Sequence, residues 1–110
     1  MIEFYCTVQE GCIPDSVRGS LEEAITQCCF NALGEDQGPV EIGWSEIPEG
    51  FGFRGGRPST TSIVRGRIPD GCDTETRTKL LMSLGDEWCR ITGAGKDEVL
   101  VAARDWSYKG

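Results

Sequence analysis

The sequence contains no histidine, which removes the most common general base of enzyme active sites. It also excludes the Ser/His and Cys/His pairs that activate a nucleophile. The six cysteines form no C-x-x-C pair, so they lack the spacing in which a tetrahedral zinc site usually collects its four ligands. We therefore expect no structural metal and no other cofactor.

Long apolar runs are also missing. No stretch of 18 apolar residues occurs, so the sequence predicts no membrane-spanning helix and no membrane partner. The opening residues, Met1 to Phe4, have neither the charged segment nor the apolar run of a signal peptide. We expect a cytoplasmic protein without disulfides, in which most cysteines are small core residues.

Positive charge is scarce and unevenly placed. The chain has 11 Lys and Arg against 18 Asp and Glu, a net charge of −7. Residues 54–67 nevertheless hold four arginines and no acid, which leaves −11 on the rest of the chain. A nucleic acid needs positive charge spread over a whole face, so we exclude nucleic acid as a partner. A local positive field on a negative body favours a small anion instead.

The apolar pattern changes along the chain and then repeats. It predicts strands at 2–8, 40–47, 61–68 and 98–103, a helix between Asp15 and Gly34, and a second between Asp73 and Gly93. Asp15 or Ser16 is expected to cap the first helix, and Asp73 the second. Gly34 and Gly93 lie 59 residues apart, as do the first strands of the two units.

The repeat defines one domain of residues 1–110, with two β-α-β units at about 1–50 and 60–106 joined by a Gly-rich hairpin. Each helix connects two strands that should be parallel, through a right-handed crossover. The predicted fold is therefore α/β (α+β), a four-stranded mixed sheet with both helices on one face. The other face is left uncovered, so we expect an oligomer.

The two β-α-β units and the turn between them resemble the tautomerase superfamily. This group includes 4-oxalocrotonate tautomerase, macrophage migration inhibitory factor and the cis-3-chloroacrylic acid dehalogenases, and the last look closest. Their turn carries a similar E-x-P-x-G-x-x-F-x-G-G pattern, matched here by Glu46, Pro48, Gly50, Phe53 and Gly55-Gly56. The resemblance implies a homotrimer whose N-terminal proline amine acts on enolisable oxo-acids, with arginines binding the substrate carboxylate.

The sequence departs from this pattern at its first residues, because Met1 is followed by Ile2 and not by proline. If Met1 matches the catalytic position, a primary α-amine stands there. An ordinary α-amine has a pKa of about 7.7–8.0, so it can act as a base or form an imine. If Ile2 matches that position, no amine is available. The sequence leaves the two alternatives open.

Further departures concern the dehalogenase residues. The two arginines of their loop before the second helix match Pro69 and Cys72, and their histidine matches Cys29. Their last-strand tyrosine matches Ala102. We therefore expect no dehalogenase activity. Cys29 and Cys72 are candidates for the edge of a substrate pocket, with inert packing as the alternative.

Arg65 and Arg67 lie two apart on a predicted strand, so both side chains face one side of the sheet. A guanidinium group matches a carboxylate in shape and charge, which makes this pair a candidate substrate-binding site. Arg54 and Phe53 of the hairpin complete the predicted site, which we place between the Met1 end of the first strand and the arginines of 54–67. The alternative is a row of ion pairs at a subunit contact.

Two functions remain. The first is an enzyme that acts on, or a protein that binds, a small oxo-acid or enol carboxylate, with the Met1 amine in place of the proline. Its activity would be that of a tautomerase or another isomerase, a hydratase or a decarboxylase. The second is a catalytically silent member of the superfamily that serves as an anion-binding or assembly module.

Overall fold

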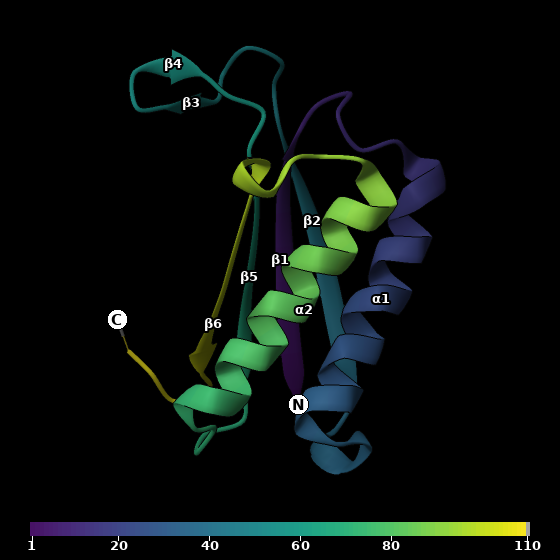
Figure 1. The fold of residues 1–110 in the computed structure, drawn as a ribbon, viewed down its shortest axis with the longest axis vertical. Helices are drawn as coiled ribbons and strands as arrows, with labels where there is room; N and C mark the ends of the chain where they lie inside the picture. The colour runs from purple at the N-terminus through teal and green to yellow at the C-terminus, as the bar shows by residue number, and fades with distance from the viewer. Residues whose placement is uncertain (110) are drawn as a thin grey trace.

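The computed structural model describes residues 1–109, and its strands and helices follow the predicted order (Figure 1). The first unit comprises β1 (Ile2–Gln9), α1 (Asp15–Leu33), a 3-10 turn η1 (Glu35–Gln37) and β2 (Val40–Ile47). A hairpin of β3 (Phe53–Arg54) and β4 (Arg57–Pro58) follows. The second unit comprises β5 (Ser62–Ile68), α2 (Thr74–Thr92), a 3-10 turn η2 (Lys96–Glu98) and β6 (Val99–Asp105).

The four long strands form one mixed sheet in the order β2-β1-β5-β6. β1 runs parallel to β2, and β5 runs parallel to β6, as each β-α-β unit requires. The two units meet where β1 pairs antiparallel with β5, with Glu3 opposite Arg67 and Tyr5 opposite Arg65. The predicted four-stranded mixed sheet is confirmed.

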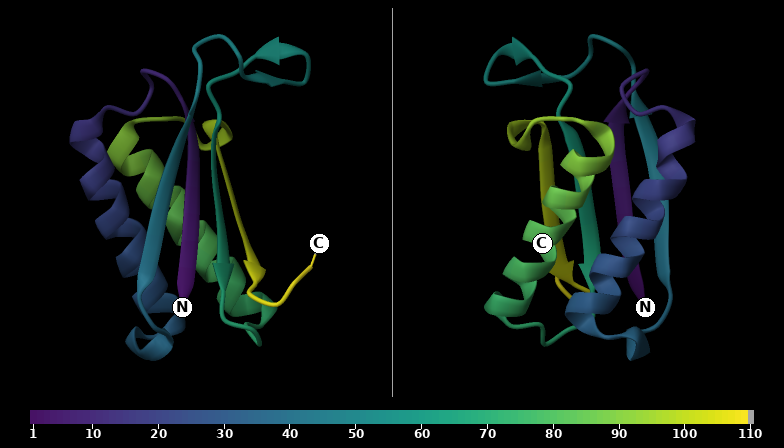
Figure 2. Two further views of the ribbon diagram at one scale, coloured as in Figure 1. Left: turned by 180° about the vertical axis from the view of Figure 1, so that it is seen from behind. Right: turned by 45° about the vertical axis from the view of Figure 1, so that its right-hand side comes forward.

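Both helices cover the same face of the sheet, and the views from behind and from the side leave the other face bare (Figure 2). The core lies between the helices and the sheet because alternate residues of the two central strands point toward the helices. These residues are all buried: Ile2, Phe4, Cys6 and Val8 on β1, and Val64 and Ile68 on β5. They pack against the apolar sides of the helices, including Leu21, Ile25, Leu80, Leu84 and Trp88.

The ends of the two helices were predicted unequally well. The carboxylate of Asp73 accepts a hydrogen bond of 2.7 Å from the backbone N–H of Thr76, and α2 ends at Gly93 in the left-handed conformation. The predicted cap of α1 is wrong. Its N-cap residue is Pro14, which has no side-chain donor or acceptor, and Asp15 lies inside the first turn, 3.6 Å from Arg18.

Two glycines lie where a ring of the neighbouring strand takes the space of a side chain. A Cβ atom built on Gly66 would lie 2.4 Å from the ring of Phe4, which is 1% exposed on the core side. A Cβ atom on Gly43 would lie 2.9 Å from the ring of Tyr5 on the opposite face. Small residues at these positions therefore allow aromatic rings to cover both faces of the sheet.

No helix among residues 1–109 combines the length and apolar character needed to cross a membrane.

Candidate functional site

The face of the sheet turned away from the helices, called the open face here, carries three arginines on neighbouring strands. Arg67 on β5 lies beside Arg104 on β6, and Arg65 is two residues from Arg67 on the same side. We call these three residues the arginine cluster. They lie beside Glu3 and Tyr5 of β1, and a shallow cavity of about 550 Å³ covers this part of the sheet.

The three guanidinium groups are held to different degrees. Arg67 is fixed from three sides: its Nη1 lies 3.7 Å from Glu3, its Nη2 donates to the carbonyl of Trp106 at 3.1 Å, and its guanidinium carbon lies 4.2 Å from the centre of the Trp106 ring. Arg104 donates one long hydrogen bond of 3.5 Å to the carbonyl of Tyr108. Arg65 has no ion pair and no side-chain hydrogen bond with any residue in the range 1–109. Arg65 therefore has its donors free for a ligand.

Charge on the open face is divided between its two halves. The arginine cluster occupies β5 and β6, whereas Glu3 lies on β1 and Glu41 lies opposite it on β2. Arg65 and Arg104 line the cavity together with the one carboxylate of Glu3, which leaves a local positive field there on a protein of net charge −7. Such a field favours a small anion, or a carboxylate of another chain.

Met1 lies at the end of β1 and is half exposed. Its amine donates a hydrogen bond of 3.0 Å to the carbonyl of Gln37, on the segment that leads into β2. A Cβ atom on Gly38 would approach the amine nitrogen to 3.0 Å, so backbone lies close against it. The amine is therefore directed to the β2 side of β1, whereas the arginine cluster lies on the β5 side.

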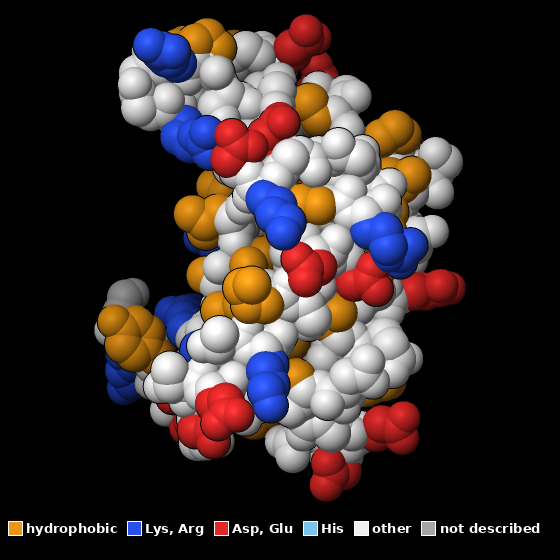
Figure 3. Space-filling model, viewed as in Figure 1, with side chains coloured by type: hydrophobic (Ala, Val, Ile, Leu, Met, Phe, Trp, Pro, Cys, Tyr) orange, Lys and Arg blue, Asp and Glu red, His pale blue; other side chains and the backbone are white. Residues whose placement is uncertain are grey.

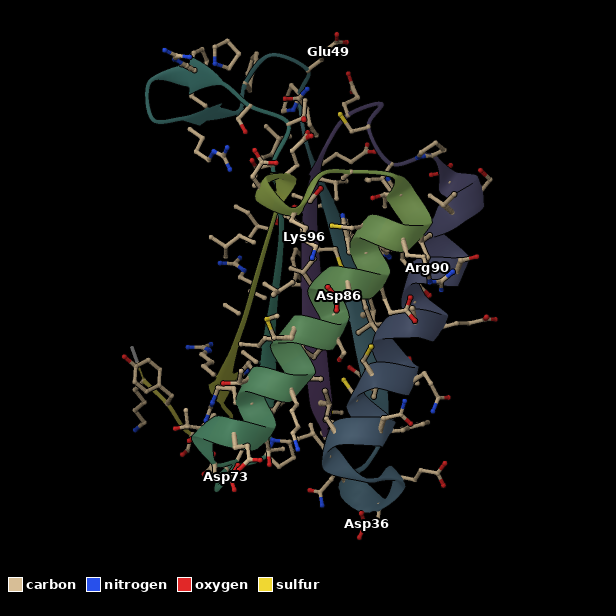
Figure 4. All side chains as sticks on the ribbon, viewed as in Figure 1. Asp36, Glu49, Asp73, Asp86, Arg90 and Lys96 are labelled. Atoms are coloured by element: carbon tan, nitrogen blue, oxygen red, sulfur yellow. The ribbon has the colours of Figure 1, made fainter. Side chains whose placement is uncertain are left out.

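A smaller cleft of about 240 Å³ at the same end of the molecule includes Gln37 and Cys72 in its lining. Two carboxylates also line it, Asp70 and Asp73, the second labelled at the lower end of α2 in Figure 4. Hydrogen bonds from Ser107 lower the pKa of Asp70, and hydrogen bonds from Thr76 lower the pKa of Asp73. Both groups are charged at neutral pH, so this cleft disfavours a substrate carboxylate.

The prediction that Cys29 lies at a pocket edge is wrong. Its side chain is fully buried on the core side of α1, four residues after the buried Ile25. Desolvation raises the pKa of its thiol to about 12, which leaves it neutral and unreactive. Cys72 lies in the lining of the small cleft, where partial burial raises the pKa of its thiol and Sγ donates to the carbonyl of Asp73 at 3.6 Å.

The prediction that the hairpin joins Met1 in one site is wrong within a single chain. Phe53 and Arg54 belong to the hairpin that projects from one end of the sheet, and Met1 lies at the other end (Figure 1). Arg54 donates to the carbonyl of Asp97 and lies 3.7 Å from its carboxylate. In the space-filling view, basic and hydrophobic side chains lie among white atoms on the hairpin, with acidic side chains next to its base (Figure 3).

Three residues of the arginine site were not predicted. Arg104 lies two residues after Ala102 on β6, the same spacing that relates Arg65 to Arg67. Residues two apart on a strand share a face, so this spacing was the signal in the sequence that could have identified Arg104. Trp106 and Tyr5 flank the cluster. No sequence pattern indicated their positions, because they depend on strand register and on the turn after β6.

No protein-family model matches the sequence, and no curated protein matches it either. Solved structures do match. Native Ps01740 has a TM-score of 0.88 and 29% sequence identity, over 97% of this chain and 99% of that chain. A fused 4-OT, a symmetric trimer, has a TM-score of 0.84 and 17% identity, over 94% and 84% of the two chains. N1, a member of the cis-3-chloroacrylic acid dehalogenase family, has a TM-score of 0.85 and 16% identity, over 94% and 73%.

Proposed function

Since this chain has the fold of the tautomerase superfamily, we propose that it binds a small carboxylate anion, such as an oxo-acid, through the arginine cluster on its open face. The observation that carries the proposal is Arg65, an exposed guanidinium whose donors are free of partners within residues 1–109. Arg67 lies on the same side of the same strand and is already oriented by Trp106 and Glu3. Two guanidinium groups on one strand match the two ends of a dicarboxylate.

The geometry favours binding over proline-type catalysis. Ile2, one of the two residues that can match the family's proline, is fully buried and offers no amine. The amine of Met1 donates to Gln37, and the cleft that shares Gln37 is lined by the carboxylates of Asp70 and Asp73. A carboxylate substrate is repelled at that end and attracted at the arginine cluster.

We therefore expect ketonisation of phenylenolpyruvate or 2-hydroxymuconate to be absent or very slow. The reason is the Met1-Ile2 start, together with the acidic cleft near the amine, where a hydrogen-bond donor or a cation would be needed to bind a substrate carboxylate. Ultraviolet absorbance of the enol, followed with and without the protein, measures the rate. Rapid turnover that disappears after acetylation of the N-terminus would contradict the prediction and make the Met1 amine the catalytic base.

A second candidate function is an enzyme that uses that amine on an oxo-acid. One observation favours it: Met1 directly precedes β1, and Glu3 on that strand lies opposite Arg67 of the cluster. A carboxylate held by Arg67 would therefore lie near the end of the strand that carries the amine. Imine trapping by borohydride in the presence of pyruvate, read as a mass increase of the intact chain, distinguishes this candidate from binding alone.

We also propose that the protein assembles as a homotrimer, in which other copies cover apolar side chains of the open face and leave the arginine cluster open to a ligand. Three large apolar side chains of this face are exposed in the single chain: Tyr5, Ile63 and Leu100. Three fused 4-OT structures with the same fold are trimers.

Sedimentation equilibrium is expected to give one species near three times the chain mass of 12.0 kDa. The physical reason is the apolar and charged surface that a single chain leaves exposed on its open face. A stable species of one chain mass at micromolar concentration would contradict this proposal.

A further inference from the structure

A separate cleft of about 470 Å³ lies at the end of the sheet opposite Met1, which we call the hairpin cleft. It is an open cleft bordered by the end of β1, the segments on both sides of the hairpin, and the 3-10 turn η2. Neither Met1 nor any member of the arginine cluster lines it. Its volume is in the range that holds a small organic molecule.

Gln9 provides the most informative group in the hairpin cleft. This glutamine is only 8% exposed, one of two buried polar residues in the described chain. Its Nε2 makes one long hydrogen bond of 3.9 Å to the sulfur of Cys12, and its Oε1 accepts no hydrogen bond from residues 1–109. Oε1 is not among the fully buried polar atoms of residues 1–109, so it reaches the cleft, where a ligand can replace water as its hydrogen-bond donor.

The walls of the cleft are fixed before any ligand binds. The N–H of Ser59 donates to the carbonyl of Gly52 at 2.7 Å, which joins the two segments that flank the hairpin. Only glycine fits at position 52, because a Cβ atom there would lie 2.6 Å from the carbonyl oxygen of Ser59 and 3.4 Å from Oε1 of Gln9. The hydroxyl of Thr60 donates to the carboxylate of Glu98 at 2.8 Å, which attaches the hairpin segment to η2.

The charges of the lining indicate the sign of the ligand. Three carboxylates, Glu49, Asp97 and Glu98, stand against one guanidinium, Arg54, which is already paired with Asp97. Glu49 has no ion pair within residues 1–109 and projects at the top of the molecule (Figure 4). No group of three or more carboxylate, cysteine or histidine side chains in this range is close enough to hold a metal ion. The excess negative charge therefore suits an organic cation better than a metal.

We infer that the hairpin cleft binds a small, hydroxylated molecule that carries an ammonium group. The ammonium group faces the carboxylates of Glu49 and Glu98, and a hydroxyl group of the ligand donates to Oε1 of Gln9. This site is independent of the arginine cluster and takes a ligand of the opposite charge. A test of this site is therefore independent of any test of the proposed anion binding.

The test uses three probes that share one pyranose ring and differ in charge: D-glucosamine, glucose and glucuronate. Each is titrated into the full ¹⁵N-labelled chain at pH 6, and affinities are taken from shifts of the side-chain amide signals of Gln9. Glucosamine is expected to bind at least fivefold more tightly than glucose, and glucuronate is expected to bind weakest. Equal affinities, the reverse order, or no shift of the Gln9 signals with any probe would overturn the inference.

Two variants locate the binding. Glu49 is exposed, and the variant Glu49→Gln is expected to reduce the preference for glucosamine over glucose at least threefold. Asp36→Asn is the matched control, because it removes one charge at the opposite end of the molecule (Figure 4) and is expected to change neither affinity. Gln9→Leu keeps the side-chain volume and is expected to weaken both sugars at least fivefold, with thermal unfolding measured to establish that it folds. Equal effects of Glu49→Gln and Asp36→Asn would overturn the assignment to this cleft.

Discussion

Replacing Gly66 with alanine is expected to destabilise the protein by about 3 kcal/mol, at the upper end of the usual penalty for overpacking a core. The added Cβ atom would lie 2.4 Å from the ring of Phe4. That ring is 1% exposed beneath the two helices, so it has no free space into which to move. The shift in the midpoint of urea unfolding, at fixed protein concentration, measures the effect.

Gly19→Ala is the matched control for this prediction. Gly19 lies inside α1, in its second turn, and a Cβ atom there meets nothing within 4 Å. Alanine is a better helix former, so this variant is expected to be more stable by up to about 1 kcal/mol. Similar unfolding midpoints for the two variants would show that Phe4 does not fill the space above Gly66.

Replacing Arg65 with alanine is expected to weaken binding of 2-oxoglutarate by tenfold or more. A hydrogen bond to a charged partner is worth about 1.5–3 kcal/mol, and Arg65 is the member of the arginine cluster whose donors are free. Its removal breaks no interaction among residues 1–109, so stability is expected to be unchanged. Isothermal titration calorimetry gives the affinity, and thermal unfolding gives the stability.

Arg57→Ala provides the control for charge, because it removes the same guanidinium from the exposed hairpin. This variant is expected to bind 2-oxoglutarate as the unmodified chain does. Sedimentation of Arg65→Ala distinguishes an anion ligand from a subunit contact. Unchanged affinity together with loss of the trimer would show that Arg65 pairs with a carboxylate of another copy.

Much of the fold was predictable because one face of each element is buried. Every second residue of β1 and β5 faces the core, and apolar residues three or four apart on α1 and α2 face the same core from the other side. The glycine at 93 and the aspartate at 73 marked the limits of α2 correctly. The start of α1 was mistaken because Pro14, Asp15 and Ser16 all suit the first turn of a helix, and spacing alone does not choose among them.

The site was predicted less completely. The pair Arg65 and Arg67 was found because period two on a strand fixes the side on which a residue lies. The error was to treat residues 54–67 as one local patch. β5 is seven residues long, about 20 Å. Arg54, on the hairpin that precedes β5, lies beyond one end of this strand, and Arg67 lies near its other end, close to Met1. The two arginines are therefore at opposite ends of the sheet. Cys29 was misplaced because its position was inferred from the resemblance to the dehalogenases, although it follows the buried Ile25 by four residues.

The central claim is that the arginine cluster, and not the amine of Met1, recognises a small carboxylate. The most direct test is the affinity of the unmodified chain for 2-oxoglutarate before and after acetylation of the N-terminus. Acetylation near pH 6.5 favours an α-amine over lysines, because its pKa is about 2–3 units lower. We predict saturable binding whose affinity is the same for both forms. Binding that is absent from the outset, or that is lost on acetylation, would contradict the claim.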